Sequence, residues 1–159
     1  MGYCGAKWCE VEAQRLLVGE YEHTIDDKHR LTLPAKFRSA FAEGAILSRG
    51  LDGCVEAYRR QDWARSVESR LAALDSFGED ARRIRRYVFG GASEADVDRQ
   101  GRVILPAHLM HYAKLEREVV VIGIHDHLEI WDRAAWRAEL ERFEGSAEDV
   151  AERLATQHD

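Results

Sequence analysis

Two short segments of this 159-residue chain combine an aspartate, an arginine four residues later and further basic side chains. The first is Asp26-Asp27-Lys28-His29-Arg30, and the second is Asp98-Arg99-Gln100-Gly101-Arg102. An aspartate at the start of a turn accepts hydrogen bonds from nearby backbone N–H groups, and the arginine can return to it as a charge-assisted pair. Lysine and arginine at a hairpin tip suit another task as well, because they can hold phosphates and reach base edges in a DNA groove. Two interpretations stay open for each segment, turn stabilisation alone or turn stabilisation combined with DNA contact.

The residue types divide these roles. The candidate turn-forming residues are Asp26, Asp98 and Gly101, and the candidate DNA-binding residues are Lys28, His29, Arg30, Lys36, Arg38, Arg99 and Arg102. The first tip is the more basic, but it has histidine where the second has glycine. A left-handed backbone costs a non-glycine residue about 1 kcal/mol, so we expect the first turn to be strained, to use another turn type, or to gain a pH-sensitive donor. We expect the first tip to read DNA and the second to be at least as much scaffold.

Both segments belong to a longer internal repeat. Each continues into Leu-Pro-Ala, at 33–35 and again 72 residues later at 105–107. Farther on, Glu56-Ala57-Tyr58 is answered by Glu129-Ile130-Trp131, displaced by 73 residues. The chain therefore contains two copies of one structural unit. An enzyme usually needs only one active site, whereas two copies of a binding unit suit a ligand that is itself repeated or symmetric. The repeat therefore favours a binding protein.

The pattern of apolar, turn and capping residues predicts the elements that position these tips. In the first copy we expect strands at 17–25, 31–33, 45–49 and 54–58 and helices at 34–41 and 61–73. In the second copy we expect strands at 87–89, up to 97, 103–105, 119–124 and 127–131 and helices from 106 and from 132. Helices at 79–86 and about 147–156 complete the chain. Because the order lacks alternating βαβ units, it predicts an α+β fold with a small antiparallel sheet or barrel.

These elements divide the chain into five predicted parts. They are an N-terminal extension without fixed structure (1–16), a first module (17–74), a linker helix (75–86), a second module (87–143) and a C-terminal helix or tail (144–159).

Bulk composition narrows the function classes. The formal net charge of −6 argues against a simple nucleic-acid binder, although phosphate contact needs only one positive face. No apolar run approaches the roughly 20 residues that span a bilayer, and the first residues lack the apolar region of a signal peptide. The three cysteines, Cys4, Cys9 and Cys54, are scattered, as expected in a reducing cytoplasm. We therefore expect a cytoplasmic protein with no membrane partner.

Enzymatic and metal-binding patterns are weak. The chain has no G-x-S-x-G, H-E-x-x-H or P-loop motif, so we expect no catalytic residues, no cofactor and no small-molecule substrate. Cys4 and Cys9 lack partners at zinc-ligand spacing, and we interpret the histidine pairs 108/111 and 125/127 as surface residues rather than metal ligands. Four arginines at 82–86 favour a solvated helix face over a phosphate strip. We expect Tyr58, Trp63, Trp131 and Trp136 to be core aromatics rather than a base-stacking platform.

The pattern G-E-Y-x-H-x-I-D-x-K-x-R-L-x-L-P-A-K-F-R at 19–38, with D-x-x-G-R-V-x-L-P-A at 98–107 and L-E-I-W-D at 128–132, resembles the MraZ family. These bacterial proteins are encoded at the head of the division and cell-wall gene cluster. The resemblance runs from about residue 17 to about residue 142. His29 departs from the family, which usually has glycine there.

The resemblance implies two AbrB-like swapped-hairpin modules that together form a small β-barrel-like core with flanking helices. It also implies a nucleoid-associated, sequence-specific repressor that assembles into a ring-like homo-oligomer and binds tandem repeats in double-stranded promoter DNA. Lys28, Arg30 and Arg102 would then make DNA contacts. The rival hypothesis is a non-catalytic interaction or scaffold module of the same fold, whose acidic C-terminal helix binds a protein partner.

Overall fold

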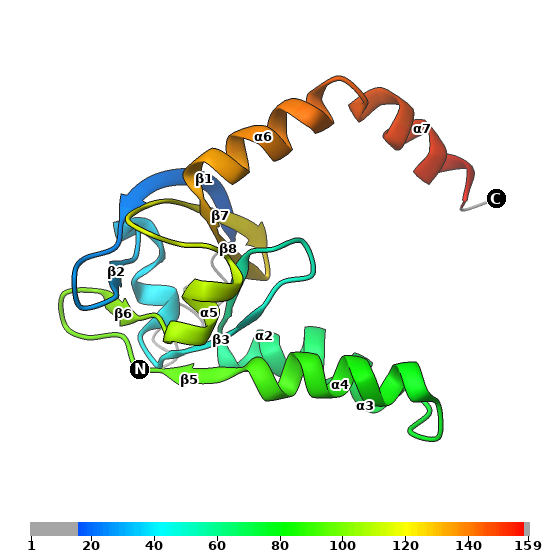
Figure 1. The fold of residues 1–159 in the computed structure, drawn as a ribbon, viewed down its shortest axis with the longest axis horizontal. Coiled ribbons are helices and arrows are strands. Elements are labelled where there is room, and N and C mark those ends of the chain that lie inside the picture. Colours follow the sequence, from blue (N-terminus) through cyan, green and yellow to red (C-terminus); the bar gives the residue numbers. More distant parts are fainter. Residues whose placement is uncertain (1–15, 158–159) are drawn as a thin grey trace, which may run out of the picture.

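The computed structural model describes residues 16–157, and the prediction for the N-terminal extension lies almost wholly outside this range. Within it the chain is an α+β protein whose centre is a six-stranded sheet with the order β1-β7-β8-β4-β3-β5 (Figure 1). Its strands are β1 (Leu17–Thr24), β3 (Ala45–Arg49), β4 (Val55–Tyr58), β5 (Ser93–Ala95), β7 (Glu118–His125) and β8 (His127–Asp132). Every pairing is antiparallel, as the order of elements predicted.

The sheet is symmetric about the pairing of β4 with β8, and the two copies exchange strands on either side of it. β1 of the first copy pairs with β7 of the second, while β5 of the second copy pairs with β3 of the first. The short strands β2 (Arg30–Thr32) and β6 (Arg102–Ile104), which follow the two Asp–Arg turns, pair with each other as a separate two-stranded sheet. The swapped arrangement implied by the family resemblance is therefore confirmed.

The expected barrel-like core is an open sheet instead. Among residues 16–157, β1 and β5 lie at opposite edges of the sheet and have no strand pairing with each other. The β2–β6 pair forms a separate two-stranded sheet. Among the described residues, only single bridges, Ile25 with Leu31 and Val97 with Val103, join it to the residues that follow β1 and β5, so no continuous strand ladder closes the two edges into a barrel.

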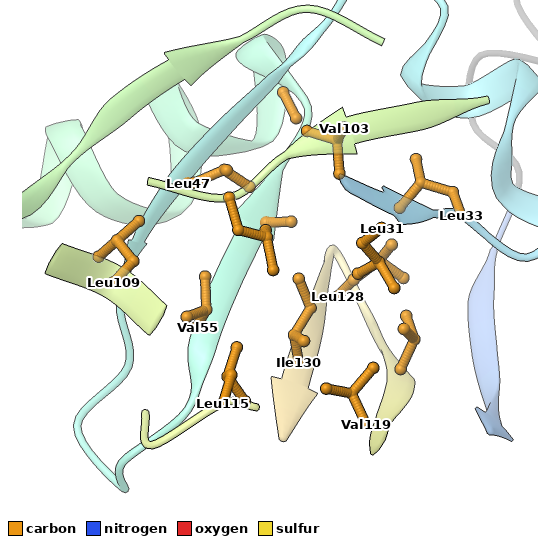
Figure 2. Close-up of a cluster of buried hydrophobic side chains, with 14 of the residues drawn as sticks. Leu31, Leu33, Leu47, Val55, Val103, Leu109, Leu115, Val119, Leu128 and Ile130 are labelled. Atoms are coloured by element: carbon orange, nitrogen blue, oxygen red, sulfur yellow. The ribbon is translucent and has the colours of Figure 1, made fainter. Parts of the chain in front are cut away.

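The core fills the space beneath the β2–β6 pair with matching residues from both copies. Leu31 and Val103 are completely or almost completely buried, and so are Leu33 and Leu105. Figure 2 shows these strands facing Leu128 and Ile130 of β8. Burial of each such side chain contributes roughly 1.5–3 kcal/mol, so the β2–β6 pair is held on the central sheet by hydrophobic packing.

The helices are more irregular than the sequence predicted. The segment expected as one helix at 34–41 forms two 3-10 turns, Ala35–Phe37 and Ser39–Phe41. The helix expected at 61–73 begins as α2 (Arg60–Trp63), continues as a π-helical stretch (Ala64–Glu68) and ends as α3 (Ser69–Ala72). The other helices are α4 (Glu79–Gly91), α5 (Ala107–Tyr112), α6 (Arg133–Glu144) and α7 (Ala147–Thr156). None of the described helices is both long and apolar enough to cross a bilayer.

The strand predicted at 87–89 is wrong, because α4 continues through it to Gly91. The more buried positions of α4 are 81, 84, 85, 88 and 91, which follow a helical period. Gly91 lies against Arg49 of β3, and Arg49 donates a hydrogen bond from Nη1 to the Tyr87 carbonyl at 3.0 Å. This contact with the first copy ties the end of the helix to the sheet.

The paired strands give a direct test of the core. We expect Leu31→Ala to lower the free energy of unfolding by about 2–5 kcal/mol, because it leaves a cavity beneath the β2–β6 pair. Ile104→Ala is the matched control, since Ile104 lies on the same small sheet but is 63% exposed, and it should change the value by less than about 0.5 kcal/mol. Urea unfolding at fixed protein concentration measures both, and equal effects would contradict the packing described.

Candidate nucleic-acid interface

The first Asp–Arg turn is organised by its aspartate. Asp26 Oδ1 accepts hydrogen bonds from the backbone N–H groups of Lys28 and Arg30, both at 2.9 Å. Its Oδ2 lies 2.6 Å from Arg30 Nε, in a charge-assisted hydrogen bond. The carboxylate therefore fixes both the backbone of the tip and the direction of the arginine.

The second turn repeats this geometry. Asp98 Oδ1 accepts from the N–H groups of Gln100 and Arg102 at 2.9 Å, and Oδ2 lies 2.7 Å from Arg102 Nε. His29 and Gly101 occupy the same place, and each donates its N–H to the aspartate carbonyl, at 3.0 and 2.9 Å. These contacts agree with the turn-forming role predicted for Asp26, Asp98 and Gly101.

His29 adopts the turn that its glycine counterpart uses. Its φ is +59°, against +76° for Gly101, so of the three outcomes expected for the first turn the structure has the strained backbone and no change of turn type. Histidine is among the residues that tolerate this region better than most. The replacement of glycine thus leaves the tip geometry intact.

Backbone hydrogen bonds lower the pKa of both turn aspartates. For Asp26 the largest contribution comes from the Arg30 N–H, and for Asp98 it comes from the Arg102 N–H. Both carboxylates are therefore charged at neutral pH, and this stabilisation of the turns is lost only as the pH falls below the ordinary value of 3.8.

The arginine head groups keep donors for a ligand. Arg30 and Arg102 use Nε for the aspartate, and neither makes a hydrogen bond through its Nη groups to another described residue. Their side chains are 28% and 29% exposed. A guanidinium held at one edge with its other donors outward is suited to phosphate oxygens or a guanine edge.

Strand exchange places Arg38 at the tip of the other copy. Arg38 lies against Gly101, where an added Cβ would overlap its side chain, and its Nε donates to the Leu33 carbonyl at 3.1 Å. A shallow hollow there is lined by Arg38, Ser39, Ala42, Val97, Asp98, Arg99 and Gly101. The second tip therefore combines Arg99 and Arg102 with Arg38 from the first copy.

The first tip gains basic residues that the sequence did not single out. His29 lines a second hollow together with Ala107, Met110, His111, Lys114, Leu115 and Glu116. His111 lies in the last turn of the second copy's helix α5, Lys114 lies two residues beyond its end, and both are exposed. Only the exchange of strands brings them to the first tip, so no pattern near residues 26–30 could have identified them.

Of the remaining candidate residues, Lys28 and Arg99 belong to the turns themselves, and Lys36 lies in the 3-10 turn that follows β2. Lys28, Lys36 and Arg99 are exposed and form no ion pair with another described residue. Both turns project from the same side of the molecule, while α3–α4 and α6–α7 extend as two helical arms on the opposite side (Figure 1). One extended ligand could therefore contact both basic tips at once.

The weaker candidates have structural roles. Among the α4 arginines, Arg82 donates from Nη1 to the Ser76 and Phe77 carbonyls, and Arg83 pairs with Glu79 and Asp80. This agrees with a solvated helix face. Trp63 and Trp131 are 4% and 6% exposed, so the prediction of core aromatics at these two positions is confirmed.

Comparison with known proteins places this repeat in a family. A family model described as "MraZ protein, putative antitoxin-like" matches the chain twice, over residues 16–87 and 88–158. The chain belongs to the MraZ family. The two matched segments each contain one Asp–Arg turn, which confirms that the chain consists of two MraZ modules.

Curated relatives extend over most of the chain. The protein named transcriptional regulator MraZ from Heliobacterium modesticaldum is 44% identical over 139 residues, which is 87% of this chain and 96% of the relative. Its namesake from Limosilactobacillus fermentum is 50% identical over 121 residues, covering 76% of this chain and 84% of the relative. The namesake from Caldanaerobacter subterraneus is 40% identical over 139 residues, covering 87% and 96%.

The paired turns allow a test of their unequal residues. Gly101→Ala should lower the free energy of unfolding by about 1–2 kcal/mol or more, because it forces a side chain into a left-handed backbone and displaces the Arg38 side chain that lies against Gly101. The reciprocal change is His29→Gly. It removes the backbone strain of the folded state, which is stabilising, but it gives the unfolded chain more conformational freedom, which is destabilising. The free energy of unfolding should therefore change by less than about 1 kcal/mol. Urea unfolding of the two variants compares them, and a larger loss for His29→Gly would show that histidine stabilises the tip.

Proposed function

We propose that this protein is a sequence-specific, DNA-binding transcriptional regulator without enzymatic activity. The observation that carries the proposal is the pair of matching Asp–Arg turns, which present arginine Nη donors and extra lysine or arginine side chains on one side of the molecule. The relatives named transcriptional regulator MraZ support the same function.

In this mechanism each aspartate holds its tip in one conformation, so little ordering is needed when DNA binds. Arg30 and Arg102 reach phosphates or base edges with their Nη groups. Lys28, His29 and Lys114 extend the first tip, and Arg99 with Arg38 extends the second. Lys36 supplies a further positive charge nearby. Both tips contact DNA in this proposal, because their geometry is the same, and the second tip serves as scaffold as well.

We further propose that the protein is a repressor of the division and cell-wall gene cluster and acts at the nucleoid as a ring-like homo-oligomer. A chain of net charge −6 gains little long-range attraction to DNA from its total charge. An assembly with several basic tips compensates for this weak attraction. Once one tip is bound, each further contact with a tandem promoter repeat is intramolecular, which raises the overall affinity.

The second candidate is a protein-interaction module. Helix α7 has no fully buried residue, and it carries Glu148, Asp149 and Glu152 beside Leu154, which is 56% exposed. Figure 1 shows α7 at the far end of a helical arm, where a partner protein could reach it. Binding of a partner without binding of upstream DNA would favour this candidate.

The DNA-binding proposal predicts a specific loss with Arg30→Ala. We expect its affinity for the DNA upstream of its own gene to fall about tenfold or more, because a phosphate- or base-contacting guanidinium is lost. Arg83→Ala is the matched control, since Arg83 is an exposed arginine on α4 and its affinity should stay at the wild-type value. Fluorescence anisotropy at several salt concentrations measures both, and a smaller salt slope for Arg30→Ala would confirm phosphate contact.

Circular dichroism should show the same fold for both variants. Wild-type affinity in a folded Arg30→Ala variant would contradict the assignment of the tip.

The avidity argument predicts a dependence on repeat number. Light scattering during size-exclusion chromatography should show a homo-oligomer. DNA with two or more correctly spaced repeats should bind at least 100-fold more tightly than DNA with one. A strictly monomeric protein with equal affinity for both DNAs would contradict the mechanism.

A further inference from the structure

One polar cluster lies away from the tips, at the seam between the two copies. Glu56 of β4 pairs directly with Glu129 of β8 across the sheet, and His127 lies two residues from Glu129 on the same face. The expectation of a surface histidine is wrong here, because the His127 side chain is only 12% exposed. Like charges directly opposite each other on neighbouring strands are destabilising, so the pair of glutamates calls for a positive partner.

The three side chains present one donor atom each to a common point. One oxygen of each glutamate and one ring nitrogen of His127 all lie within 4.8 Å of one another. His127 Nε2 is buried, makes no hydrogen bond with a described residue, and lies 3.6 Å from Glu129 Oε1. This buried ring nitrogen makes no hydrogen bond to a described residue although two carboxylates lie within 4.8 Å of it, and that arrangement needs an explanation.

A second set of contacts orients the His127 ring. His127 Nδ1 lies 2.7 Å from Asp126 Oδ1, and Ser66 donates its hydroxyl to Asp126 Oδ2 at 2.6 Å. The imidazole also stacks on Tyr58, with 4.7 Å between ring centroids. A carboxylate on one ring nitrogen directs the lone pair of the other outward, which is the usual arrangement around metal-binding histidines.

The two glutamates are oriented in the same way by their own copies. Tyr58 donates its hydroxyl to Glu56 Oε2 at 3.0 Å, and Trp131 donates Nε1–H to Glu129 Oε2 at 2.8 Å. In each case the donor follows its glutamate by two residues and leaves Oε1 for another partner.

We propose that Glu56, His127 and Glu129 bind one zinc ion, which joins the first copy to the second at the β4–β8 seam. One imidazole and two carboxylates suit a borderline metal such as zinc better than calcium or magnesium, which prefer oxygen ligands alone. Tetrahedral zinc with bonds of about 2.1 Å needs donors about 3.4 Å apart, so the side chains close by roughly 1 Å or slightly more. Water takes the fourth position.

Zinc binding to the full-length chain tests this inference. Equilibrium dialysis followed by metal analysis should find one zinc per wild-type chain at this site. Glu56→Gln, Glu129→Gln and His127→Asn should each lose it, although glutamine can still accept from Tyr58 or Trp131 and asparagine can still donate to Asp126. Zinc at about 100 times its dissociation constant should raise the thermal midpoint of the wild type by roughly 5–10 °C. It should not raise the midpoint of any of these variants.

Two controls separate other sources of binding. His125→Asn removes an exposed histidine two residues away, at a left-handed φ of +71° that asparagine tolerates, and it should keep the zinc. A Cys4→Ser, Cys9→Ser double variant should keep it as well. Absence of bound zinc, which would leave a protonated His127 as the partner of the glutamates, would overturn the proposal. The proposal would also be overturned if zinc binding were lost only in the Cys4→Ser, Cys9→Ser double variant. Zinc binding by a folded His127→Asn variant would overturn it too.

Discussion

The antiparallel pairing of β2 with β6 is the constraint on which the rest of the structure depends. Leu33 donates its backbone N–H to the Gly101 carbonyl, and Leu105 donates to the His29 carbonyl. Each bond joins a core strand of one copy to the tip residue of the other. The same pairing brings Leu31 and Val103 over the central sheet and carries Arg38 and Lys114 across to the opposite tips. The conformation of each tip and the packing of the core therefore both depend on contacts between the two copies.

Much of the fold was predictable because its signals are local. The Asp52-Gly53 turn between apolar runs predicted the β3–β4 hairpin, and the antiparallel class followed from the order of elements. Asp26 and Asp98 could be assigned to the turns because an aspartate side chain reaches N–H groups only two to four residues away. Spacing in the sequence is sufficient information for contacts of this range.

The remainder could not be predicted because it depends on contacts between the copies. Nothing near Tyr87-Val88-Phe89 indicates that α4 continues through this stretch of good strand propensity and contacts Arg49, which is far away in the sequence. The composition of each tip, the open sheet and the group around His127 likewise depend on which strand pairs with which. The sequence alone indicates a surface position for His127, because the Glu56–Glu129 pair beside it forms only in the register of β4 with β8.

The strand exchange also determines the order in which the chain can fold as it leaves the ribosome. β1 must wait for β7, which is synthesised about 100 residues later, and every pairing across the copies is similarly non-local. Until then the nascent first copy exposes a strand edge and an incomplete apolar face. We expect slow, late folding, and a separated half should either aggregate or pair with a second half. The same exposed surfaces would let two single-module chains form this fold as a dimer.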